Sequence, residues 1–120
     1  FFIPTDPDHR AAYDWMAANR TPLITTDYAI DETLTLMRAR RQHRKAVDFG
    51  SDVFGGSLAD VHYLTPADIA VAWDVFRQFA DKDWSFTDCT SYVVIARLGL
   101  SAAFSFDQHF RQFGTVAVVP

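Results

Sequence analysis

The sequence has a single cysteine and two lysines, and it contains no long apolar run. One cysteine excludes an internal disulfide and fits a reducing compartment, so we expect a cytoplasmic protein. No stretch approaches the roughly 20 apolar residues of a membrane-spanning helix. The sequence also shows no basic segment followed by an apolar one, so it does not predict a signal peptide. Four scattered histidines and one cysteine give none of the spacings of a zinc site.

The 120 residues correspond in size to one domain, and 49% of them are apolar. A chain of this length can bury roughly two-thirds of its unfolded surface, so we expect a single globular domain over residues 1–120. The net charge of −4 argues against a general nucleic-acid binder, which is usually basic.

Positive charge is concentrated in one segment, because five of the eleven basic residues fall between Arg38 and Lys45. The plainest interpretation is a set of cations at a helix C-terminus, where the helix dipole favours them. Five charges exceed what capping needs. Contact with phosphates, or with an acidic protein segment, is the alternative.

Predicted strands and helices alternate along the chain. Short apolar runs bounded by turn residues predict strands at residues 1–3, 23–25, 61–64, 102–106 and 115–119. Helical spacing and caps predict helices over 7–19, from Thr26 or Asp27 to about Arg40, over 43–54, from 65–66 through 79, and from Ser85 to Gly99, with a turn or short helix at 107–112. This alternation predicts an α/β domain with a mostly parallel sheet.

Acidic residues follow the ends of several predicted strands. Asp27 and Glu32 come after the strand at 23–25, Asp88 lies at the start of a helix, and Asp107 follows the strand at 102–106. Ligands of parallel sheets bind beyond the carboxyl ends of the strands. These carboxylates are therefore the candidate site.

Each of these acids also has a structural explanation. Asp27 can cap its helix, Ser85 and Asp88 have the spacing of a capping box, and Asp107 can cap a turn. Glu32 lies at the rim of the apolar face of its helix, where it extends to solvent or points into a cleft. Its neighbour Asp31 is expected on the solvated face. Position alone does not separate these interpretations.

Taken together, the acids predict a metal site. Two carboxylates ~4 Å apart repel by about 4 kcal/mol at an effective dielectric of ~20, so a cluster needs a cation or protons. Oxygen ligands select Mg²⁺ or Mn²⁺, which activate water and bind phosphate oxygens. The hydroxyls of Ser85 and Thr87 could hold a metal-bound water or a phosphate. The hypothesis is metal-assisted phosphodiester hydrolysis.

Other chemistry-bearing side chains have plainer roles. Trp15, Trp73, Phe76 and Phe79 fall at helical spacing, so we assign them to packing, with a helix–helix or dimer contact as the alternative. Cys89 is expected to be a small buried residue. His9 and His109 are interpreted as surface or capping residues, with substrate contact as the alternative.

Three segments together resemble a known family: TTDYAIDETLTL from Thr25, DWSFTDCTS from Asp83 and FSFDQHF from Phe104. They are similar to the three later motifs of PIN-domain ribonucleases, and more narrowly to VapC-type toxins of bacterial and archaeal toxin–antitoxin pairs. The opening DPDHRAA from Asp6 and the closing FRQFG from Phe110 fit the same pattern. The resemblance covers nearly the whole chain, and the order and separation of the motifs are more specific than any one of them.

The resemblance implies a three-layer α/β/α domain with a central, mostly parallel sheet of about five strands. It implies an acidic Mg²⁺ or Mn²⁺ site that cleaves RNA, inhibition by a cognate antitoxin protein, and a homodimer. Glu32, Asp88 and Asp107 match the second, third and fourth acids of the family, and Thr87 or Ser85 matches the accompanying hydroxyl. The family's first acid lies just before the position of Phe1. Since the sequence opens without Met, we expect the first strand to begin upstream.

Two alternatives belong to other classes of protein. A catalytically deficient PIN-like binding module, acting through protein or RNA partners, is favoured by the acidic net charge and by the lack of the first acid. A phosphoacceptor receiver domain shares the layered architecture and a carboxylate pocket. It also needs a lysine after a late strand, and residues 102–106 contain none, so it ranks last.

Overall fold

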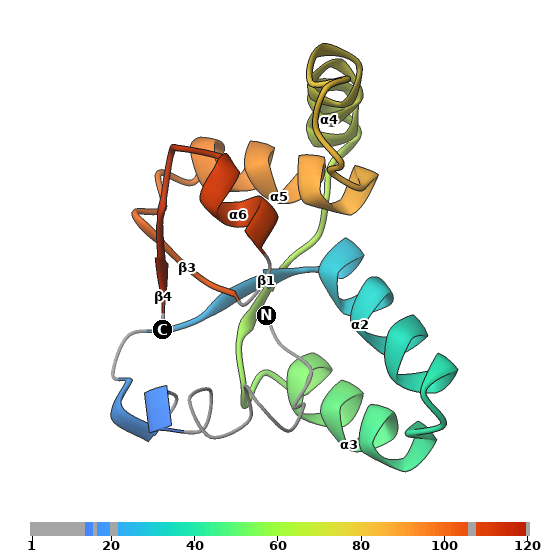
Figure 1. Ribbon diagram of the computed structural model, residues 1–120. Coiled ribbons are helices and arrows are strands. Elements are labelled where there is room, and N and C mark those ends of the chain that lie inside the picture. The colour runs from blue at the N-terminus through green and yellow to red at the C-terminus, as the bar shows by residue number, and fades with distance from the viewer. Residues whose placement is uncertain (1–13, 16, 20–21, 106–107, 120) are drawn as a thin grey trace. The chain divides into compact units, whose positions relative to one another are not determined.

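The computed structural model describes residues 14–15, 17–19, 22–105 and 108–119 (Figure 1). The chain divides into two compact units, one within residues 3–63 and the other within residues 64–120. The strand expected at 1–3 and most of the helix expected over 7–19 lie outside the described residues. Within the described ranges, no helix has the length and apolar character needed to cross a membrane.

The first unit contains two parallel strands joined by two helices. Strand β1 (Ile24–Thr26) leads into α2 (Asp27–Ala39), and α3 (His43–Phe54) precedes β2 (Asp60–His62). Thr25 pairs with Val61 in the parallel register of β1 and β2. Helices α2 and α3 lie side by side, joined by a tight turn at the end of α2 farthest from β1 (Figure 1).

Local hydrogen bonds explain where α2 begins. The Thr26 side chain accepts a hydrogen bond from the backbone N–H of Ala29 at 3.0 Å, so Thr26 is the N-cap. Asp27 lies in the first turn instead, where the helix dipole favours a carboxylate. Of the two caps left open by the sequence, the structure selects Thr26.

The end of α2 has an unusual residue in its turn. The backbone N–H of Gln42 donates to the Met37 carbonyl at 2.9 Å, and that of Arg41 donates to the Arg38 carbonyl at 3.0 Å. This is the Schellman arrangement, whose left-handed position is usually taken by glycine. Here Arg41 occupies it with φ of 58°, which costs roughly 1–2 kcal/mol for a residue with a Cβ.

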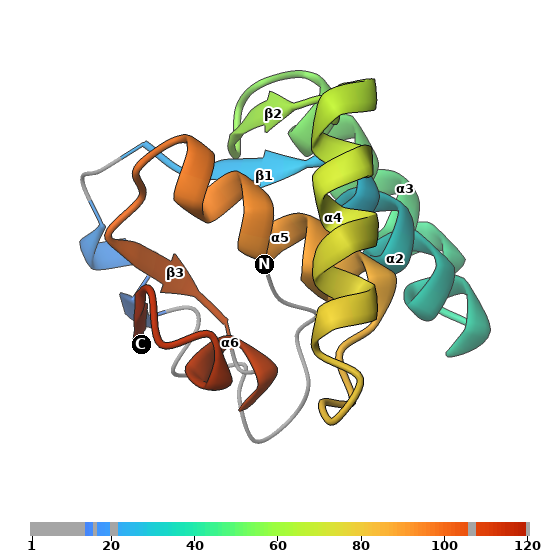
Figure 2. The same cartoon turned by 90° about the horizontal axis from the view of Figure 1, so that it is seen from above.

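The second unit consists of α4 (Pro66–Gln78), α5 (Phe86–Arg97), β3 (Ala102–Phe104), α6 (Gln108–Gln112) and β4 (Ala117–Val119). Strands β3 and β4 are parallel, with Ala103 opposite Val118. Helix α4 packs across α5, and α6 contacts both α5 and β4 (Figure 2).

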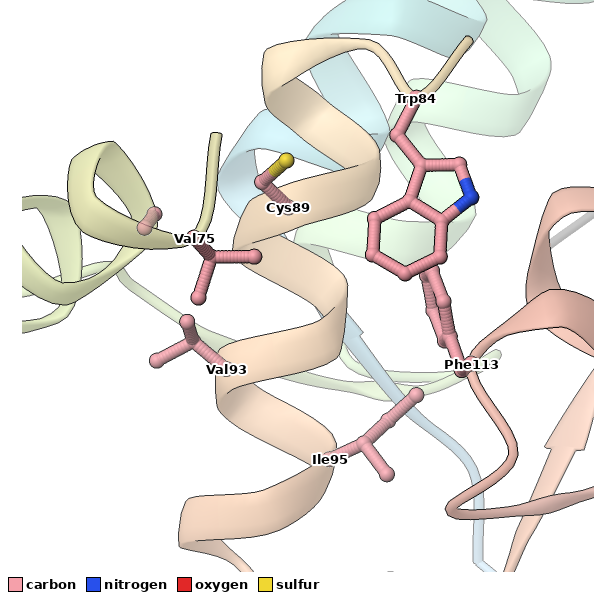
Figure 3. Close-up of a cluster of buried hydrophobic side chains, with 7 residues drawn as sticks. Val75, Trp84, Cys89, Val93, Ile95 and Phe113 are labelled. Carbon is pink, nitrogen blue, oxygen red and sulfur yellow. The ribbon is translucent and has the colours of Figure 1, made fainter. Parts of the chain in front are cut away.

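Aromatic and aliphatic side chains from four segments form the core of the second unit (Figure 3). Val75 of α4 points toward Val93 of α5. The Trp84 ring meets Phe113 edge-on, with centroids 4.8 Å apart, and its indole N–H donates to the Gln112 side-chain oxygen at 2.8 Å. Cys89 is buried in the same core, as its sequence context predicts.

Two expectations about packing need correction. The run at 23–25 was expected to be a buried strand, but β1 is displaced by one residue and Ile24 is exposed while the two threonines are buried. Trp73 and Phe76 of α4 are 52% and 41% exposed and stack on each other, because α5 packs mainly against the face of α4 that carries Ala72 and Val75. Phe76 nevertheless packs in part, since its ring meets that of Phe86 in α5 edge-on, with centroids 6.0 Å apart. Helical spacing identified residues that share a face, but not which of them a neighbour covers.

The fold class is confirmed as α/β with parallel strands. The described residues contain four strands in two parallel pairs, so the expected count of about five is not confirmed. Strand ends also differ: β2 begins one residue early and ends two residues early relative to 61–64, and β3 ends two residues before position 106.

Candidate metal centre

The centre of the candidate site is Asp88, in the first turn of α5. The Ser85 hydroxyl accepts a hydrogen bond from the Asp88 N–H at 3.0 Å, and Asp88 Oδ2 accepts one from the Ser85 N–H at 3.0 Å. This is a complete capping box, so the structural explanation of Asp88 is confirmed. The box also buries the carboxylate and holds it in one orientation.

His109 of α6 makes a second contact with the same carboxylate. Its Nδ1 lies 2.9 Å from Asp88 Oδ2, and the ionised carboxylate can only accept, so the imidazole N–H donates. Both hydrogen bonds that the described residues make with the Asp88 carboxylate therefore use Oδ2, and Oδ1 remains available to a cation. The sequence identified His109 only as a surface, capping or substrate-contacting residue. The contact joins residues 21 positions apart, and no local pattern indicates it.

Asp68 shows what an ordinary buried capping acid looks like in this protein. Like Asp88, it completes a capping box, with Thr65 at the start of α4. Its charge is compensated by the guanidinium of Arg97, which pairs with Asp68 Oδ1. Within the described part of the chain, Asp88 has no Arg or Lys nitrogen within the 4.0 Å of an ion pair.

The difference in charge compensation between Asp68 and Asp88 indicates that Asp88 can bind a cation. A buried carboxylate is costly unless a positive group compensates it. For Asp88 the described compensation is the helix N-terminus, one backbone N–H and one imidazole. An oxygen-lined position of this kind fits a hard divalent cation. The residues present are therefore compatible with the Mg²⁺ or Mn²⁺ expected from the sequence.

The negative charge of Asp88 also affects its neighbour in α5. Burial, with a smaller contribution from the Asp88 carboxylate, raises the pKa of the Cys89 thiol above its ordinary value of 9.0. The thiol is therefore protonated at neutral pH and is a poor nucleophile. Cys89 belongs to the core rather than to the chemistry of the site.

The two hydroxyl candidates also lie at the start of α5. Ser85 is the exposed N-cap, and because its oxygen accepts from the Asp88 N–H, its own proton remains to be donated. Thr87 is half-buried, and its backbone carbonyl accepts a 2.6 Å hydrogen bond from the buried Thr90 hydroxyl. Both side chains are thus placed within one turn of Asp88.

The other two candidate acids do not belong to the described part of the second unit. Glu32 is an exposed residue of α2 in the first unit, as is its neighbour Asp31. Asp107 lies outside the described residues. Where side chains are described, no group of three His, Cys, Asp or Glu residues is placed to hold a metal ion. The three-carboxylate site therefore stays a prediction.

Comparison with known proteins establishes the family. The PIN domain family matches residues 1–116, and the chain belongs to this family. Two similar curated proteins are the 23S rRNA-specific endonuclease VapC20 of two Mycobacterium tuberculosis strains, each 29% identical over 115 residues, which cover 96% of this chain and 87% of the relative.

A solved structure gives the same assignment. The crystal structure of M. tuberculosis VapC20, described as a sarcin–ricin loop cleaving toxin, matches with a TM-score of 0.87 and 29% identity over 96% of this chain and 88% of that one. The resemblance stated from the sequence is thereby confirmed: the protein is a PIN-domain nuclease of the VapC toxin type.

Proposed function

We propose that the protein, as one PIN domain over residues 1–120, is a Mg²⁺- or Mn²⁺-dependent endoribonuclease in which Glu32, Asp88 and Asp107 ligate the ion. The observation that carries the proposal is the buried Asp88 carboxylate, which is held through Oδ2 by two donors and has no Arg or Lys partner among the described residues. It contrasts with Asp68, whose charge Arg97 compensates.

The side chains have distinct roles in this proposal. The bound ion would polarise a phosphate oxygen and lower the pKa of an attacking water. Asp88 would hold the ion through its free carboxylate oxygen, and His109 acts as a positioning residue that fixes the carboxylate plane through Oδ2. The hydroxyls of Ser85 and Thr87 donate hydrogen bonds to phosphate oxygens or to a water at the site. Glu32 and Asp107 complete the ligand set.

The substrate and partners follow from the class of enzyme. VapC20 is named as specific for 23S rRNA, which supports structured ribosomal RNA as the substrate class here. A VapC-type toxin implies a cognate antitoxin protein that covers the site. We propose a homodimer as well, supported by the exposed, stacked rings of Trp73 and Phe76 on α4. The single cysteine supports a cytoplasmic location.

Charge-neutral substitutions test the function directly. Glu32→Gln and Asp88→Asn variants of the full-length protein should remain folded and lose cleavage of ribosomal RNA fragments, because each removes one anionic ligand and little volume. Circular dichroism checks the fold, and gel analysis of the RNA reports cleavage. Retained cleavage in both variants would refute the proposed site.

A second candidate function is a catalytically deficient PIN module that binds RNA or protein. The capping box favours it, because it explains Asp88 without any metal. Calorimetric titration of the full-length protein with Mn²⁺ separates the two. Binding that disappears in Asp88→Asn supports the nuclease, and lack of binding supports the module.

A further inference from the structure

Five exposed cations surround the turn between α2 and α3, and we refer to them as the basic corner: Arg38, Arg40, Arg41, Arg44 and Lys45. Helices α2 and α3 lie against each other in the first unit, and the five residues lie at and beside the turn that joins them (Figure 1). The chain carries a net charge of −4 and this corner carries +5, so the remainder carries −9. The corner is thus a local positive surface on an acidic protein.

The cations of the basic corner have no ion-pair partner among the described residues. In the ranges that the structure describes, none of the five has a carboxylate within the 4.0 Å of an ion pair. Elsewhere in the chain Arg77, Lys82 and Arg97 each pair with an aspartate. The corner therefore holds charge that no carboxylate of the described residues neutralises through an ion pair.

Helix capping does not explain this accumulation of charge. Arg38 lies in the last turn of α2 and agrees with the dipole, whereas Arg44 and Lys45 lie in the first turn of α3, where the dipole disfavours cations. That turn contains no acidic residue, and the Gln42 side chain does not cap it. Arg41 occupies a left-handed position that glycine would adopt more easily.

We propose that the basic corner binds the phosphate backbone of the RNA substrate, next to the site of cleavage. This inference rests on the proposed function. Arg40 follows Glu32 by eight residues, or about 12 Å along α2 at 1.5 Å per residue. An acidic enzyme repels its polyanionic substrate unless part of its surface is positive, and arginine pairs with phosphate through two parallel hydrogen bonds. Such contacts supply affinity and register but do not read sequence.

Arg41 provides a test in which loss of binding cannot come from unfolding. Arg41→Gly removes one charge and relieves the left-handed conformation, so it should raise Tm by about 3 °C. It should also weaken binding of a ribosomal RNA fragment, measured in EDTA so that no cleavage occurs, by several-fold. Arg41→Lys keeps the charge but not the two parallel hydrogen bonds, so its affinity should lie between those of Arg41→Gly and the wild type.

A triple variant and a matched control extend the test. Arg40→Gln, Arg41→Gly and Arg44→Gln combined should weaken RNA binding by roughly 10–100-fold and lower the slope of log affinity against log salt by about 2, since each lost phosphate contact removes roughly 0.7. Arg77→Gln is the control, because Arg77 is also exposed but pairs with Asp74. Its affinity and slope should match the wild type.

The outcomes separate this inference from the function on which it rests. Unchanged RNA affinity and salt slope in the triple variant, with cleavage intact in the wild type, overturn the inference and leave the nuclease standing. Lack of cleavage by the wild type overturns the proposed function itself. If the triple variant loses binding only to an acidic peptide such as poly-glutamate, the basic corner is a protein-docking surface and the inference is also overturned.

Discussion

The two capping boxes of α4 and α5 allow the candidate metal ligand to be tested with a matched pair of substitutions. Asp68 and Asp88 occupy the same position in their boxes, are both buried, and accept a hydrogen bond at 3.0 Å from the N–H three residues before them. Arg97 compensates the first charge and His109 contacts the second. Replacing either residue with asparagine keeps a capping oxygen and removes the charge.

The expected costs in stability are of similar size. Asp68→Asn removes the partner of Arg97, whose side chain is 51% exposed, so water screening limits the loss to about 2 kcal/mol. Asp88→Asn loses the attraction of its charge to the helix N-terminus, roughly 0.3–1 kcal/mol, and about 1 kcal/mol of hydrogen-bond strength. Each change corresponds to a fall in Tm of several degrees, so both variants stay folded.

Metal-dependent stability then distinguishes the two carboxylates. At a Mn²⁺ concentration 100 times its dissociation constant, the wild type should gain about 2.7 kcal/mol of stability, measured by urea unfolding with and without the ion. Asp68→Asn should keep this gain and keep RNA cleavage. Asp88→Asn should lose both. An Asp88→Asn variant that still gains stability from Mn²⁺, or equal losses in the two variants, would refute the argument from uncompensated charge.

Three further predictions concern His109, the core and Cys89. His109→Ala should lower the Mn²⁺ affinity measured by calorimetry about tenfold, and His109→Asn should recover part of that affinity through its amide donor. Equal Mn²⁺ affinity in the wild type and both variants would exclude a positioning role. Phe113→Ala should lower the free energy of unfolding, measured in urea, by about 3–4 kcal/mol, because Phe113 packs against Trp84 and Tyr92. The control Phe54→Ala, at a 57% exposed position, should lower it by less than about 1 kcal/mol. Burial raises the pKa of the Cys89 thiol above 9.0, so the thiol's contribution to stability is complete below that pH and declines above it. The wild type should therefore lose more stability than Cys89→Ala between about pH 8 and about pH 10. Equal losses of stability in the two proteins would contradict this prediction.

The sequence predicted those features that neighbouring residues determine. Thr26, Thr65 and Ser85 begin helices as expected, because a cap is a contact between residues three positions apart. The helix over 43–54 ends at Gly55 as predicted. Strand ends were displaced by one or two residues, since pairing with a partner strand decides where a strand ends.

The sequence could not predict features that depend on distant contacts. The pairing of His109 with Asp88 joins two helices, and the pairing of Arg97 with Asp68 distinguishes two acids whose local patterns are the same. The exposure of Trp73 depends on which face of α4 meets α5. Likewise, the left-handed conformation of Arg41 follows from the short turn into α3 and has no signature in residue type.

Locating bound Mn²⁺ by its anomalous scattering, in crystals of the full-length protein, tests the metal centre most directly. We expect a single strong peak about 2.1 Å from Asp88 Oδ1 and from carboxylate oxygens of Glu32 and Asp107. A saturated crystal with no peak at Asp88, or with the ion bound away from all three side chains, would contradict the account and leave these acids as helix and turn caps.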